Sequence, residues 1–172
     1  MTPSTEAPQH EFNLISEFYG GRQARRSGVP LINHVIEGIR ILRDYGEPET
    51  TVGAWCLHPM VQGDADLERT LSQGLLQRAN PVAVALAMEY RFRANSYLSY
   101  MPPNEEPSWG HVHAVRVMLI ADKVQNRKDF EQHLADHPEV RNGDRLRAYY
   151  KEWLEALKVD EDEYIRLVKL LP

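Results

Sequence analysis

Apolar residues recur every three to four positions along most of the chain, which is the spacing of one face of an α-helix. Phe12, Ile15 and Phe18 form the first such stripe, and Val35 and Ile39 belong to the second. Runs that alternate between apolar and polar residues, which would indicate strands, are nearly absent. The pattern therefore predicts an all-α fold, a helical bundle with short connections. Helices are expected over about 12–19, 30–46, 49–57, 66–79, 80–101, 111–134, 143–158 and 161–170.

Glycine, asparagine and proline residues mark several helix boundaries. Gly46 follows an apolar stripe and is typical of a helix C-terminus, whereas Asn80-Pro81 is typical of a helix start. His58-Pro59 falls inside an apolar stretch. Because proline removes a backbone hydrogen bond from a helix, we expect the helix either to kink here or to end and restart with Pro59 in its first turn.

Composition and charge narrow the class of protein. The 172 residues include 20 basic and 25 acidic side chains, a net charge of −5, which argues against binding of bulk nucleic acid or of a membrane surface. Cys56 is the only cysteine, so no intrachain disulfide can form and a cytoplasmic location is expected. No apolar run reaches membrane-spanning length, and the N-terminus lacks the features of a signal peptide. We expect a flexible tail over residues 1–8 and one helical domain over 9–172.

The irregular and C-terminal segments add two further expectations. Three prolines in MPPNEEPSWG, residues 101–110, predict the longest loop of the body, and Trp109 near its end is a candidate for stacking on a base. The last two expected helices carry more apolar residues than a terminal helical hairpin needs. They are expected either to pack on the body or to form a homo-oligomer interface.

A basic loop precedes the second expected helix. Residues 20–43 carry five arginines but only one acidic residue, Glu37. Arg22, Arg25 and Arg26 lie close together in this loop, and guanidinium groups bind phosphate oxygens through paired hydrogen bonds. The alternative interpretation is a solvated loop with ordinary surface arginines.

Two polar residues stand in apolar surroundings. His58 lies in the apolar stretch 54–64, where a single histidine is either a core residue with satisfied hydrogen bonds or a ligand. Asp122 follows five apolar or small residues, so its carboxylate needs a partner or a bound cation if it is buried. A salt bridge to an arginine of a neighbouring helix is the alternative for Asp122. His111 and His113 are two positions apart and would point in different directions on a helix, so we treat them as separate residues.

Three motifs in order, RRSGVPLINH (25–34), AWCLHPMVQGDADL (54–67) and LIADKVQN (119–126), resemble those of the HD phosphohydrolase superfamily. The resemblance is greatest to the RelA/SpoT-type alarmone hydrolases and their small single-domain relatives, and small phage dATP triphosphohydrolases share the layout. It covers about residues 12–130. It implies an HD-domain helical bundle that hydrolyses a nucleotide, a (d)NTP or a ppGpp-like alarmone, with a divalent metal such as manganese or zinc.

The resemblance also implies roles for individual residues. His34, His58 and Asp122 match three of the metal ligands of such proteins. A further set is expected to contact the nucleotide, and its members are Arg22, Arg25, Arg26, Lys123 and Asn126.

The chain departs from the family at its His-Asp pair. His58 is followed by Pro59, so one carboxylate ligand is missing, and the acidic pair that activates water in the alarmone branch is replaced by Gln62 and a glycine. Glutamine can orient a water molecule but cannot accept its proton at neutral pH. We therefore assign the catalytic positions to Gln62 and Asp64, with Asp64 or Asp66 as a displaced carboxylate.

Three functions remain open. The chain is a metal-dependent nucleotide phosphohydrolase with a remodelled site, or a catalytically inactive HD-fold module that binds a nucleotide or a partner. The third alternative is a scaffold in which His34 and Asp122 are merely paired in the core. The hydrolase requires a divalent metal and water activation, whereas the inactive module requires only nucleotide binding.

Overall fold

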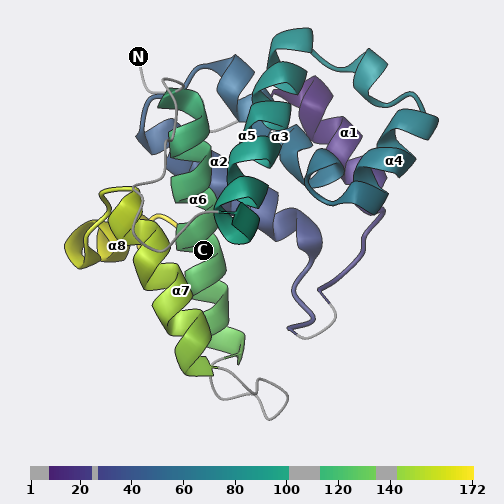
Figure 1. The fold of residues 1–172 in the computed structure, drawn as a ribbon. Coiled ribbons are helices and arrows are strands. Elements are labelled where there is room, and N and C mark those ends of the chain that lie inside the picture. The colour runs from purple at the N-terminus through teal and green to yellow at the C-terminus, as the bar shows by residue number, and fades with distance from the viewer. Residues whose placement is uncertain (1–7, 25–26, 101–112, 135–142) are drawn as a thin grey trace.

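The computed structural model describes residues 8–24, 27–100, 113–134 and 143–172, and over these residues the chain forms helices and no strand. The predicted all-α bundle is thereby confirmed (Figure 1). A single β-bridge between Gln23 and Pro30 joins the two sides of the loop before the second helix. None of the described helices is long and apolar enough to cross a membrane. The α-helices are α1 (Gln9–Tyr19), α2 (Leu31–Asp44), α3 (Glu49–Gln62), α4 (Asp64–Ser72), α5 (Pro81–Tyr100), α6 (His113–Asp129), α7 (Gly143–Ala156) and α8 (Glu161–Val168).

Helix α3 forms the centre of the N-terminal half. Its sequence is apolar on nearly every side, and a helix of this kind is stable in water only when other elements surround it. Accordingly α1, α2, α4, α5 and α6 all pack against α3. Trp55, Leu57 and Met60 are fully buried within this packing.

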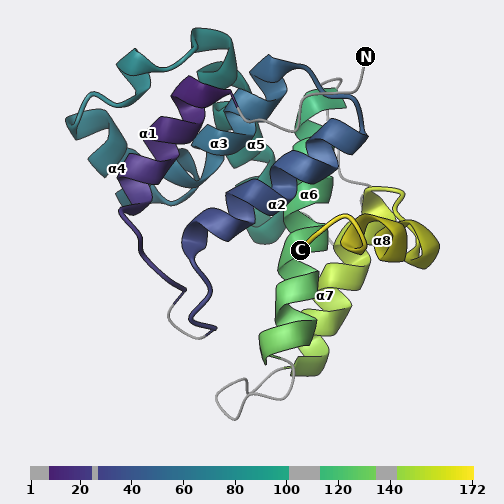
Figure 2. The same cartoon turned by 180° about the vertical axis from the view of Figure 1, so that it is seen from behind.

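Helix α6 is the second buried helix. Its middle, from Val117 to Gln125, is almost completely inaccessible to solvent. Helix α2 crosses α6 in the view of Figure 2 and packs along it, while α7 and α8 also contact α6. Because α2, α3 and α6 are in mutual contact, polar side chains on their facing sides meet in one place.

Most of the expected helix ends are found where the sequence indicates them. Gly46 has a left-handed φ of 73°, and the side-chain oxygen of Asn80 accepts a hydrogen bond of 2.9 Å from the backbone N–H of Val82. The single helix predicted over 66–79 is wrong. The chain instead forms α4 and then a 3-10 turn, Leu76–Arg78, because Gly74 takes a left-handed φ of 66° that ends the α-helix.

Pro59 lies inside α3 rather than at a break. The helix predicted to run only to about residue 57 therefore continues to Gln62. At the other end of the chain, the long helix predicted to reach 134 ends as an α-helix at Asp129 and continues as a π-helical turn, Phe130–Leu134. Residues 1–7 of the expected tail over 1–8 lie outside the described residues. The proline-rich loop with Trp109, and His111, fall on residues 101–112 and also lie outside them.

Candidate metal centre

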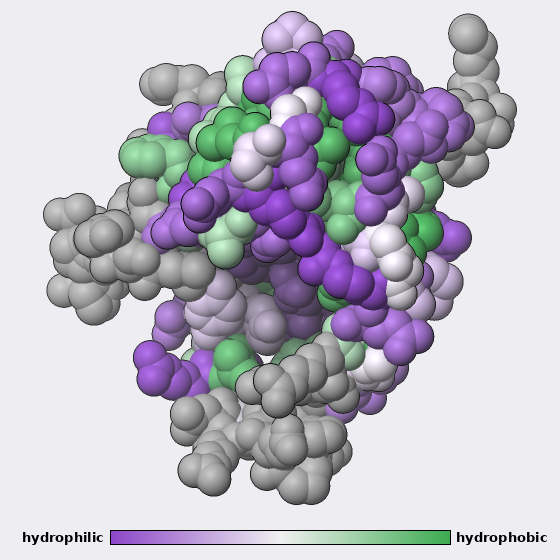
Figure 3. Space-filling view, turned by 90° about the vertical axis from the view of Figure 1, so that its right-hand side faces the viewer, coloured by the Kyte–Doolittle hydropathy of each residue, from purple (hydrophilic) through white to green (hydrophobic). Residues whose placement is uncertain are grey.

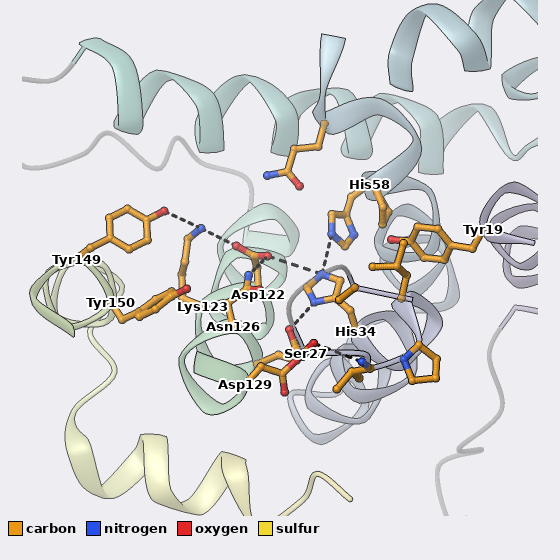
Figure 4. Close-up of a pocket in the computed structure, with 17 residues that line it drawn as sticks. Tyr19, Ser27, His34, His58, Asp122, Lys123, Asn126, Asp129, Tyr149 and Tyr150 are labelled. Atoms are coloured by element: carbon orange, nitrogen blue, oxygen red, sulfur yellow. Dashed lines mark hydrogen bonds and ion pairs between the residues drawn. The ribbon is translucent and has the colours of Figure 1, made fainter. Parts of the chain in front are cut away.

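The three predicted metal ligands converge from three different helices (Figure 4). His34 of α2 and His58 of α3 bring their Nε2 atoms within 3.1 Å of each other. The Asp122 carboxylate of α6 lies 3.7 Å from His34 Nε2. One donor atom from each residue lies within 4.8 Å of the others, so the three side chains could hold a single metal ion.

The ring of His34 is oriented by a neighbour from α6. Its Nδ1 lies 2.5 Å from the side-chain oxygen of Gln125, and the Gln125 amide nitrogen donates a hydrogen bond to Asp129. Because the amide nitrogen serves as the donor to Asp129, the atom near Nδ1 is the amide oxygen, which can only accept, so Nδ1–H donates a hydrogen bond to it. In the neutral ring this leaves the lone pair on Nε2, the atom that faces His58 and Asp122.

His58 is oriented from within its own helix. Its Nδ1 lies 2.5 Å from the main-chain oxygen of Trp55, an atom that can only accept, so Nδ1 carries the proton and Nε2 carries the lone pair. The rings of Trp55 and Tyr90 lie 4.1 Å and 4.9 Å from the His58 ring. Burial, with the neighbouring His34 as the next contribution, lowers the pKa of His58 to about 3. His58 is therefore neutral at physiological pH.

Asp122 is held ionised by its neighbours. Lys123 Nζ lies 2.6 Å from one carboxylate oxygen, and the Asn126 amide donates to the other at 2.7 Å. Burial is the largest single contribution and by itself raises the pKa of Asp122. Lys123, His34 and His58 together outweigh burial and hold that pKa below its usual value. Lys123 and Asn126, both predicted to contact a nucleotide, thus also position Asp122.

The three candidate ligands, His34, His58 and Asp122, line a cavity of about 450 Å³. Figure 3 shows a hollow near the centre of one face, with mainly hydrophilic residues inside it. Volumes of this order are typical of small-molecule sites. Besides the three candidate ligands, the lining consists of Tyr19, Ala24, Ser27, Val29, Pro30, Leu31, Pro59, Gln62, Lys123, Gln125, Asn126, Asp129, Tyr149 and Tyr150.

The structure separates the two predicted catalytic residues. Gln62 lines the cavity, and its main-chain oxygen accepts hydrogen bonds from Arg91 and Asn95. Asp64 is exposed, forms an ion pair with Arg91 and is not among the lining residues. The missing carboxylate is therefore not supplied by Asp64 in this arrangement.

The basic loop is only partly described. Arg22 donates hydrogen bonds to the main-chain oxygens of Phe18 and Tyr19 and does not line the cavity. Arg25 and Arg26 lie outside the described residues. Their predicted contact with phosphate stays a prediction.

Several residues that shape the centre were missed by sequence reasoning. Trp55, Tyr90 and Gln125 surround the two histidines, yet each has the appearance of an ordinary residue of an apolar helix. The sequence does contain one local signal for the role of Trp55. Pro59 has no N–H to donate to the carbonyl four residues earlier, and that carbonyl belongs to Trp55.

The chemistry of the donors fits a divalent transition-metal ion. With both Nδ1 atoms protonated, the two Nε2 lone pairs and the Asp122 carboxylate face one another, and a shared proton or a cation relieves their repulsion. The Tyr90 hydroxyl is buried and makes no hydrogen bond of normal geometry within the described residues. Burial, followed by the negative charge of Asp122, raises the pKa of Tyr90 above its ordinary value.

No protein-family model, no curated protein and no solved structure matches this chain.

Proposed function

We propose that this chain is a metal-dependent phosphohydrolase that acts on a nucleotide. The observation that carries the proposal is the convergence of His34, His58 and Asp122 in a cavity that is large enough for a nucleotide. The resemblance of the three sequence motifs to HD phosphohydrolases supports the same assignment. Membership of that superfamily is part of the proposal.

His34, His58 and Asp122 would hold the ion through two neutral imidazoles and one carboxylate, a set that suits manganese, zinc or a similar metal. When bound, such an ion acidifies water and polarises a phosphoryl oxygen. Gln62, which lines the same cavity, orients a water molecule but does not take its proton.

The charge of the cavity makes nucleotide binding depend on the metal. Among the described lining residues, Asp122 and Asp129 are acidic and only Lys123 is basic. These walls alone repel phosphate, whereas a divalent cation between the ligands reverses the sign of the local charge. Tyr19, Tyr149 and Tyr150 offer aromatic faces on which a base can stack. Removal of the metal is therefore expected to abolish nucleotide binding.

A second candidate is a module that binds a metal and a nucleotide without turnover. It is favoured by the position of Asp64, which pairs with Arg91 and is not among the residues that line the cavity with Gln62. A site without a general base loses a factor of about 10²–10⁴ in rate. Turnover measurements separate this candidate from the hydrolase.

Elemental analysis of the purified chain after incubation with Mn²⁺ or Zn²⁺ is the first test. We expect about one metal ion per chain, lost in His58→Ala and in Asp122→Asn and retained in His133→Ala, which changes an exposed histidine away from the cavity. The loaded protein is then assayed for phosphate release from deoxynucleoside triphosphates and ppGpp-like nucleotides. Absence of bound metal in the wild-type chain would overturn the proposal, and metal-dependent nucleotide binding without phosphate release would establish the second candidate.

A further inference from the structure

Pro59 removes one backbone hydrogen bond from α3, about one turn before its own position. In an α-helix each backbone N–H donates to the carbonyl four residues earlier, so residue 59 normally serves the carbonyl of residue 55. Proline has no N–H. The Trp55 carbonyl therefore receives no hydrogen bond from position 59, although α3 continues through it.

The side chain of His58 takes the place of that missing donor. Its Nδ1 lies 2.5 Å from the Trp55 oxygen, within a fully buried environment. The carbonyl accepts a hydrogen bond from Nδ1–H, and the neutral ring then keeps its lone pair on Nε2. That Nε2 atom faces His34 Nε2 at 3.1 Å.

Trp55 also contacts α2, the helix that carries His34. Its indole N–H donates to the main-chain oxygen of Val35 at 2.9 Å, next to His34 in α2. The Trp55 ring also lies 5.0 Å from the His34 ring and 4.1 Å from the His58 ring. One residue therefore sets the relative positions of both imidazoles.

We propose that Pro59 is a positioning residue: by withholding a backbone N–H, it leaves the Trp55 carbonyl free to hold His58 with its Nε2 lone pair directed at His34 and Asp122. The inference rests on the metal site of the proposed function and extends it. Pro59 supplies no ligand itself, but it selects the tautomer and orientation of His58, the ligand beside it.

The test replaces Pro59 with alanine and measures three quantities. Nitrogen chemical shifts of the His58 ring, recorded on the metal-free protein, report which nitrogen carries the proton. We expect Nδ1–H in the wild-type chain and a mixture with Nε2–H in Pro59→Ala, because the new N–H competes for the Trp55 carbonyl. The affinity for Zn²⁺ should fall about tenfold. The unfolding temperature should rise, because alanine suits a helix interior better than proline.

Opposite changes in stability and affinity distinguish this role from a merely structural one. Pro81→Ala is the matched control. Pro81 occupies the first position of α5, where a backbone N–H has no partner within the helix, so its absence deprives no helix carbonyl of a hydrogen bond. It should change neither the His58 spectrum nor the Zn²⁺ affinity. An unchanged His58 tautomer in Pro59→Ala would overturn the inference, even if the wild-type chain binds metal. If the wild-type chain binds no metal, the proposed function fails, while the spectra of the metal-free protein still decide the tautomer.

Discussion

Glu37 and Lys128 form a buried ion pair between α2 and α6, with Lys128 Nζ 2.6 Å from Glu37 Oε1. The pair joins the helix of one candidate ligand, His34, to the helix of another, Asp122. Lys128 also lies 3.3 Å from Asp129, which accepts the hydrogen bond from Gln125. A continuous polar chain therefore leads from Glu37 to the ring of His34.

Breaking this pair on one side is expected to destabilise the fold. Lys128→Met leaves the Glu37 carboxylate buried without its partner, which costs about 3–5 kcal/mol. The double variant Glu37→Leu with Lys128→Met should recover most of that loss, because neither charge is then buried. Urea unfolding of the three proteins measures the difference. Equal stability of the single and double variants would contradict this account, because it would show that the unpaired Glu37 carboxylate does not cause the loss.

Gln125 is expected to control metal affinity through His34. Gln125→Leu removes the acceptor of the His34 Nδ1 proton, and loss of such an orienting partner weakens metal binding by about 10- to 100-fold. Titration with Zn²⁺ gives the affinity. Gln132→Leu, an exposed glutamine outside the cavity, serves as the control and should leave the affinity unchanged. Equal affinities in the two variants would remove Gln125 from the site.

Gly38 provides the space for Trp55. A Cβ atom at position 38 would lie 2.1 Å from the Trp55 ring, so Gly38→Ala must displace the indole and is expected to cost about 1–3 kcal/mol. Metal affinity should fall with it, because Trp55 positions both histidines. Gly53→Ala is the matched change inside a helix, and there the nearest atoms lie at an ordinary 3.4 Å. Thermal unfolding should therefore show Gly38→Ala as the less stable variant, and the opposite order would contradict the packing described.

Gln62 is expected to limit the rate of hydrolysis. Gln62→Glu keeps the size of the side chain and adds a group that accepts a proton, so kcat should rise by about a hundredfold. Gln62→Leu, which can neither orient water nor take its proton, should lower kcat below the wild-type value. Phosphate release by metal-loaded protein measures both. A glutamate variant no faster than the wild type would argue for the module without turnover.

Cys56 is expected to be unreactive in the folded protein. Burial, followed by the charge of Glu11, raises the pKa of its thiol well above the ordinary value, so the reactive thiolate is not formed at neutral pH. A disulfide reagent at pH 8 should modify Cys56 only in urea concentrations that unfold the chain. The midpoint of labelling should match the midpoint of the circular dichroism transition. Rapid labelling without denaturant would show that α3 opens locally.

The sequence by itself determined the helical class and most helix positions. Apolar periodicity predicts α1, α2 and α5 closely, and Asn80 marks the start of α5, because both signals depend only on neighbouring residues. His34, His58 and Asp122 were predicted as a candidate ligand set from the resemblance of their three motifs to those of HD phosphohydrolases. The cost of burying a carboxylate without a partner independently singled out Asp122.

Only the tertiary structure decided how those residues are held. His34 and Gln125 are 91 positions apart, and Asp64 turns to Arg91 instead of the cavity. The difference has a physical cause. A helix is stabilised by contacts within a few residues, whereas the direction of an imidazole lone pair depends on which helices pack together and which hydrogen-bond partners they bring.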